Sequence, residues 1–179
     1  MSELPALGFP HTYLGELAKR GRAIRQARGI YLHPDADIPA HFSLAFACRQ
    51  VNGGVICLLS ALRFHEIGTQ NPHEVWLALD RKARQPVAAS TTLRIVRFSG
   101  KALTEGIETV KGPFPLRVYN PAKTVTDCFK YRHKIGIDVA IEALKEGWRE
   151  RRFTLPELDH YARICRVERI LTPYLEAIL

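Results

Sequence analysis

Five basic residues stand close together near the start of this 179-residue chain. They are Lys19, Arg20, Arg22, Arg25 and Arg28. Lysine and arginine side chains bind phosphate oxygens, and such contacts release counterions from a nucleic acid. The chain also carries a formal net charge of +8, which attracts polyanions in general. The charge becomes informative only if these residues lie on an element shaped to meet a groove.

The residues that usually carry catalysis form no recognisable constellation. The sequence has no glycine-rich phosphate loop, no His-Glu-x-x-His and no Gly-x-Ser-x-Gly. Asp127, Glu74 and Asp80 are carboxylates that a nuclease could gather around Mg²⁺, but helix capping and salt bridges explain them more simply. The histidines without ligand spacing are His65, His73, His133 and His160. We therefore expect no catalytic residue, no metal, no cofactor and no enzymatic activity.

The four cysteines are scattered and form no Cys-x-x-Cys pair, which argues against zinc. They are Cys48, Cys57, Cys128 and Cys165, each in apolar company. Reduced cysteines behave in this way when they serve as small core residues. The sequence therefore predicts structural thiols.

A short helix is predicted from about Thr12 to Arg20. Its apolar residues recur at helical spacing at Leu14, Leu17 and Ala18. Thr12 is suited to cap the start, and Lys19 and Arg20 fall in the last turn, where the helix dipole favours cations. Gly21 suits the left-handed position just beyond the end.

The segment 22–33 is predicted to be a hairpin with a glycine-containing turn, because β-branched and aromatic residues run up to Pro34. The result is a basic two-stranded wing that carries Arg22, Arg25 and Arg28. The same three-residue spacing also fits a solvated stripe on a helix, which stays open as the alternative.

A linker rich in proline and aspartate follows at 34–39, so we expect one unit at 1–34 and another at 40–179. The second unit is predicted to be an α/β domain with a small mixed sheet and a C-terminal helical bundle. Its expected strands are 55–57, 74–79, 93–98, 109–111 and 116–119. Its expected helices are 41–51, 60–65, 121–131, 138–148, one opened by Thr154 and one over 167–179. Asn120 and Thr154 are expected to cap the helices that they precede, Thr154 with Glu157 in a capping box. The fold class is therefore α+β.

Two further basic groups lie in this second unit. Arg94, Arg97, Lys101, Lys111 and Arg117 are candidates for one basic face of the sheet. The run Arg149–Arg152 is a charge cluster of the kind that is usually solvated. No stretch approaches the roughly 18 apolar residues of a membrane span, so we expect a cytoplasmic protein without a membrane partner.

Three stretches of the sequence resemble the AbiEi antitoxin family. The first ends in Arg28-Gly29-Ile30-Tyr31, the second is 54–65 with Val75-Trp76-Leu77-Ala78 downstream, and the third is 118–127, which reads VYNPAKTVTD. Their order and spacing carry the resemblance more than any single motif does. Together they span most of the chain.

The resemblance implies an N-terminal winged helix–turn–helix followed by a C-terminal α/β antitoxin domain. It also implies a regulator that represses its own promoter and opposes a nucleotidyltransferase toxin without binding it stably. The expected partners are therefore double-stranded DNA carrying an inverted repeat and, functionally, such a toxin.

In a winged helix–turn–helix the exposed face of the second helix meets base edges, and wing cations meet phosphates. The residues expected to contact DNA are His11, Thr12, Tyr13, Lys19, Arg20, Arg22, Arg25 and Arg28. Arg20 is expected to bind guanine with two hydrogen bonds, and the wing arginines to bind phosphates. For Tyr13 and Glu16 an ordinary surface role fits equally well.

Only ten residues precede His11, fewer than the family's full motif needs, so we expect a shortened winged helix–turn–helix. Two alternatives follow from this departure and from the carboxylates. One is an interaction protein that does not bind DNA and neutralises a toxin through the C-terminal domain. The other is a metal-dependent nuclease that uses Asp127.

Overall fold

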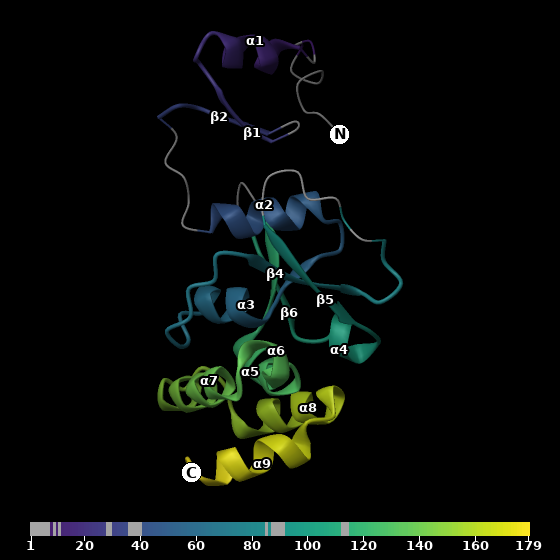
Figure 1. Cartoon of the computed structure of the whole chain (residues 1–179), viewed down its shortest axis with the longest axis vertical. Helices are drawn as coiled ribbons and strands as arrows, with labels where there is room; N and C mark the ends of the chain where they lie inside the picture. Colours follow the sequence, from purple (N-terminus) through teal and green to yellow (C-terminus); the bar gives the residue numbers. More distant parts are fainter. Residues whose placement is uncertain are drawn as a thin grey trace. The chain divides into compact units, whose positions relative to one another are not determined.

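The computed structural model describes residues 8, 10, 12–27, 30–35, 41–84, 86, 92–111 and 115–179. His11 and Arg28, two of the predicted DNA contacts, lie outside the described residues. The chain divides between Ala40 and His41 into two compact units, and most of their elements are labelled in Figure 1. The larger unit comprises His41–Pro86 and Thr91–Leu179.

The smaller unit contains one helix and one hairpin. Helix α1 (Tyr13–Lys19) is followed by strands β1 (Ile24–Ala27) and β2 (Ile30–Leu32), which pair antiparallel. The predicted helix and hairpin are confirmed. The alternative, a helix with a stripe of arginines in place of the hairpin, is wrong, because this segment forms two paired strands. Thr12 occupies the N-cap position, but its helical backbone angles leave its side chain without a capping hydrogen bond.

The larger unit is built on a five-stranded sheet with strand order β5-β4-β3-β7-β6. The strands are β3 (Val55–Ile56), β4 (Val75–Asp80), β5 (Leu93–Phe98), β6 (Ile107–Val110) and β7 (Leu116–Tyr119). β3 pairs antiparallel with β4 and parallel with β7, β4 pairs parallel with β5, and β6 pairs antiparallel with β7. The predicted mixed sheet is confirmed.

One face of this sheet is covered by α2 (Phe42–Gln50), which Figure 1 shows on the opposite side from α5, α7 and α8. Alternation along the strands sends every second side chain to this face. The apolar layer between α2 and the sheet contains Leu44, Ala45, Ala47, Ile56, Val75, Leu77, Leu79, Leu116 and Val118. Neighbouring strand residues point into the other layer, so both faces of the sheet carry buried residues, although most of β6 at the edge is exposed.

The other face packs against the remaining helices. These are α3 (Leu58–Phe64), α4 (Lys101–Thr104), α5 (Pro121–Lys130), α6 (Arg132–Ile135), α7 (Ile137–Arg149), α8 (Leu155–Cys165) and α9 (Glu168–Glu176). α5 contacts α3, α7, α8 and α9 and lies at the centre of the group. Every residue from Ala122 to Phe129 is buried. α5 is therefore the helix on which this side of the core is assembled.

Two helix starts follow the predicted capping chemistry. The Asn120 side chain accepts a hydrogen bond from the backbone N–H of Lys123, with Pro121 in the first turn. Thr154 and Glu157 form a complete capping box at the start of α8. Within the described residues, no helix is long and apolar enough to cross a membrane.

Candidate nucleic-acid interface

The end of α1 determines how the chain enters the hairpin. Gly21 has φ +71, and its N–H donates to Ala18 O, while the N–H of Arg22 donates to Leu17 O. This is the Schellman arrangement, in which a left-handed residue closes a helix. The Schellman arrangement fixes the direction in which the chain leaves α1. It therefore holds Arg20, at the helix end, within one turn of Arg22, at the approach to β1.

The hairpin register places the next arginine. Arg25 pairs with Tyr31 across the strands, so both side chains lie on one face, and a bulge separates Arg25 from Ala27. A Cβ built on Gly15 would lie 4.0 Å from the Tyr31 hydroxyl, so this face is turned toward α1. The hairpin therefore holds Arg25 on the side that carries the helix.

Lys19, Arg20, Arg22 and Arg25 form what we call the basic helix–hairpin surface. All four are exposed, and among the described residues none is in an ion pair. Glu16 is the one acidic residue in the sequence between Thr12 and Arg28. The local charge is therefore strongly positive and uncompensated by its described neighbours.

The other predicted contacts, at the start of α1, differ in exposure. Thr12 is exposed beside the first turn, whereas Tyr13 is half-buried and engaged within the protein. A surface role without DNA contact therefore fits Tyr13 better than it fits Thr12.

Two residues of the predicted basic face of the sheet, Arg94 and Arg97, do not share one face. Arg94 and Arg97 are three residues apart on β5, so alternation sends them to opposite faces. Arg94 pairs with Glu74 at 2.9 Å and lies 5.4 Å from the ring centroid of Trp76. Arg97 donates to the carbonyl oxygens of Asp80 and Ala83. These two arginines are used within the protein.

Sequence reasoning missed a fully buried ion pair inside the larger unit. Lys123 Nζ donates to Asp127 Oδ2 at 2.5 Å, and neither side chain is exposed to solvent. The Lys123 ammonium lies 4.2 Å from the ring centroid of Tyr119 and 4.9 Å from that of Phe98, which adds cation–π stabilisation. The Cys165 thiol donates to Asp127 Oδ1 at 3.2 Å. Burial raises the pKa of Asp127, and Lys123 opposes that effect.

The carboxylates named for a nuclease do not converge. Asp127 is occupied by Lys123, while Glu74 and Asp80 lie at opposite ends of β4 and Glu74 pairs with Arg94. In the part of the chain that the structure describes, no three His, Cys, Asp or Glu residues gather as a metal site would require. Asp127 and Glu74 form salt bridges, which is one of the simpler roles that the sequence analysis gave for these carboxylates.

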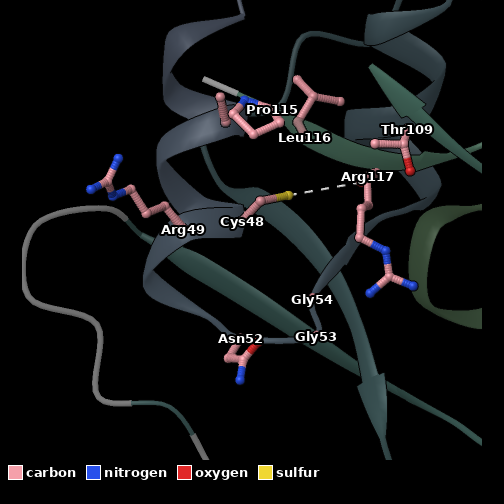
Figure 2. Close-up of a pocket in the computed structure, with 10 residues that line it drawn as sticks. Cys48, Arg49, Asn52, Gly53, Gly54, Thr109, Pro115, Leu116 and Arg117 are labelled. Atoms are coloured by element: carbon pink, nitrogen blue, oxygen red, sulfur yellow. Dashed lines mark hydrogen bonds between the residues drawn. The ribbon is translucent and has the colours of Figure 1, made fainter. Parts of the chain in front are cut away.

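A pocket of about 440 Å³ opens between α2 and β7, with the Gly53–Gly54 turn at one end (Figure 2). The Cys48 thiol donates to Arg117 O at 3.8 Å, and burial raises the pKa of this thiol. The thiol therefore stays protonated near neutral pH and is a weak nucleophile. Figure 2 shows Arg49 and Arg117 on opposite sides of Cys48.

No protein-family model matches this chain, and a search of curated proteins finds no significant match. The functional interpretation therefore rests on the chain's own residues.

The i, i+4 spacing of Lys123 and Asp127 was visible in the sequence, but such pairs are usually exposed, and only the packing of α5 shows that this one is buried.

Proposed function

We propose that this protein is a DNA-binding transcriptional regulator of the AbiEi antitoxin type. The observation that carries the proposal is the basic helix–hairpin surface, in which one helix end and one strand present four exposed cations. Cations without an ion pair among the described residues are available to phosphates, whose neutralisation supplies most of the affinity of such proteins.

The proposed binding mode follows the geometry of a shortened winged helix–turn–helix. α1 enters the major groove, where Arg20 at its C-terminal end donates two hydrogen bonds to a guanine. Lys19, Arg22 and Arg25 contact the phosphates on either side. The Schellman turn at Gly21 holds the helix and the wing in a fixed relation, so that both can engage one groove.

The biological role that we propose is repression of the protein's own promoter at an inverted repeat. Opposition to a nucleotidyltransferase toxin, without a stable complex, is part of the same proposal and rests on the sequence resemblance. The larger unit, with its own core on both faces of a sheet, is the part proposed to act as the antitoxin domain.

Binding to a fluorescent duplex tests this proposal. The duplex carries the region upstream of the gene, a scrambled duplex serves as competitor, and salt is varied from about 50 to about 200 mM. We expect preference for the native duplex and a steep fall of affinity with salt. Replacing Lys19, Arg22 and Arg25 by Ala should flatten the salt slope by about three units, because each phosphate contact contributes roughly one.

The matched control replaces Arg63, Arg81 and Arg169 by Ala. These arginines belong to the larger unit, are exposed, and have no ion pair among the described residues. The control lowers the net charge by the same amount, so a general loss of positive charge would affect both variants equally. Equal loss in both, or no binding at about 50 mM salt, would contradict the proposal.

A further inference from the structure

A second concentration of positive charge lies in the larger unit, in a hollow of about 670 Å³ where α4, the end of α5 and the end of α8 meet. Four of its lining residues are cationic, and no lining residue is acidic. The cations are Lys101, Lys130, Arg163 and Arg166, and Ser99 adds a hydroxyl. Concave sites with a few convergent polar groups are typical ligand sites.

Two of these cations form ion pairs within the protein. Arg163 lies 2.6 Å from Asp159 and 3.4 Å from Glu168, and Lys101 lies 3.9 Å from Glu105. Lys130 and Arg166 have no ion pair among the described residues. The nearby Asp127 carboxylate is taken by Lys123.

Each of the two cations without an ion pair has one local feature that the structure shows. Lys130 lines the hollow, and its ammonium lies 5.8 Å from the ring centroid of the buried Phe98, within cation–π range. Arg166 has φ +59, the left-handed conformation that closes α8, with its N–H donating to Arg163 O and that of Val167 donating to Ala162 O. Glycine is the residue favoured at such a position. An arginine there carries a backbone strain that a glycine would relieve.

We propose that this hollow binds the phosphoryl group of a small molecule, with Lys130 and Arg166 as the principal ligands and the Ser99 hydroxyl as a further donor. A guanidinium and an ammonium on two sides match the charge and the several acceptor oxygens of a phosphate. The proposal concerns the larger unit alone and does not depend on DNA binding by the smaller one.

Calorimetric titration in a phosphate-free, low-salt buffer tests the site with two probes, inorganic phosphate and phenyl phosphate. We expect saturable binding of at least one probe. Tighter binding of phenyl phosphate identifies a phosphomonoester as the ligand, and tighter binding of inorganic phosphate identifies the free ion. Lys130→Met should weaken binding about tenfold, which corresponds to about 1.4 kcal/mol.

Arg166→Gly gives the decisive variant, because its two expected effects have opposite signs. Removing the guanidinium should weaken phosphate binding about tenfold, a typical effect of losing a charged hydrogen bond, while relief of the left-handed strain should raise the Tm. The matched control is Arg151→Gly. Arg151 closes α7 in the same way, with φ +54, and lies outside the hollow. This control should raise the Tm and leave phosphate binding unchanged.

Three results would overturn the proposal. They are no saturable binding of either probe, unchanged binding in Arg166→Gly, and an equal loss in Arg151→Gly. A fourth result would also do so: if Arg166→Gly and Lys130→Met weaken duplex binding as strongly as phosphate binding, these cations serve a nucleic-acid backbone and not a small ligand.

Discussion

Lys123 and Asp127 are both fully buried, so each charge depends on the other. Bringing two charges out of water costs several kcal/mol, which the short contact and the flanking rings offset only while both partners are present. At the scale of single residues, this pair is therefore the most sensitive point of the larger unit. A change that leaves one charge alone should be far more harmful than a change that removes both.

Asp127→Ala is expected to lower the free energy of unfolding by about 3–5 kcal/mol, because it leaves the Lys123 ammonium buried without a counter-charge. Urea denaturation followed by tryptophan fluorescence measures the loss. The comparison variant combines Lys123→Met with Asp127→Leu, which removes both charges and keeps the volume. It should recover most of the stability, and a double variant as unstable as the single one would contradict this account.

Single residues also show where sequence reasoning reached its limit. It predicted correctly that the cysteines would be reduced, and the structure has all four as free thiols. It did not predict that Cys165 would donate to Asp127, because the two residues lie on different helices and no local pattern links them. Contacts between distant segments depend on packing, which the residue types alone do not specify.

At the scale of elements, α8 begins with a capping box whose strength depends on pH. Glu157 accepts hydrogen bonds from the backbone N–H and the hydroxyl of Thr154 at 2.8 and 2.7 Å. These bonds lower the pKa of Glu157. A carboxyl whose pKa is lower in the folded state contributes stability above its unfolded pKa, and this contribution is lost as the pH falls through the folded pKa.

Thr154→Ala is therefore expected to cost about 1 kcal/mol at neutral pH, as the loss of an N-cap does. The difference from the wild type should shrink below about pH 4, where Glu157 takes up a proton in both proteins. Thr172→Ala is the control, because the Thr172 hydroxyl donates to the backbone of Glu168 and titrates no group. Its cost should not change with pH, and a parallel pH dependence in both variants would rule out the box as the cause.

The ends of the helices show why some elements were predictable and others were not. Gly21 signalled the end of α1, and the structure has the left-handed turn there. Glu66, Arg151 and Arg166 close α3, α7 and α8 in the same conformation without glycine. A local pattern is recognised through the residue that favours it, so these three ends gave no signal in the sequence.

At the scale of the whole molecule, the two units differ sharply in burial. No residue of α1 is buried, and Ile24 of the hairpin is 47% exposed. By contrast, α5 is buried from Ala122 to Phe129. Local opening is least costly where few apolar contacts are lost, so the smaller unit should open far more often than the core of the larger one.

Amide hydrogen exchange followed by mass spectrometry tests this difference. Peptides from α1 and the hairpin should exchange at least about a hundredfold faster than peptides from α5. Helix α9, which has a single buried residue, Leu171, provides an intermediate reference in the larger unit. Equal protection of α1 and α5 would show that the smaller unit has a source of stability beyond its described residues.

The mixed sheet was predictable because its strands carry clear apolar runs, and β5 was placed at 93–98 as found. The order in which the strands pair was not predictable. β3 has only two residues, too few for any period to show, and yet it lies between β4 and β7. The winged helix–turn–helix, the assignments of 1–34 and 40–179, and the DNA contacts stay predictions.

The position of β3 has a consequence for how the protein is made. Ile56 pairs on one side with Leu77, which follows it closely in the chain, but its other partner, Val118, belongs to a much later part of the chain. While the ribosome is still producing the intervening residues, the nascent sheet carries an open apolar border at β3. That border closes only when β7 has emerged, and until then it is the place where a chaperone would bind or two nascent chains would stick together.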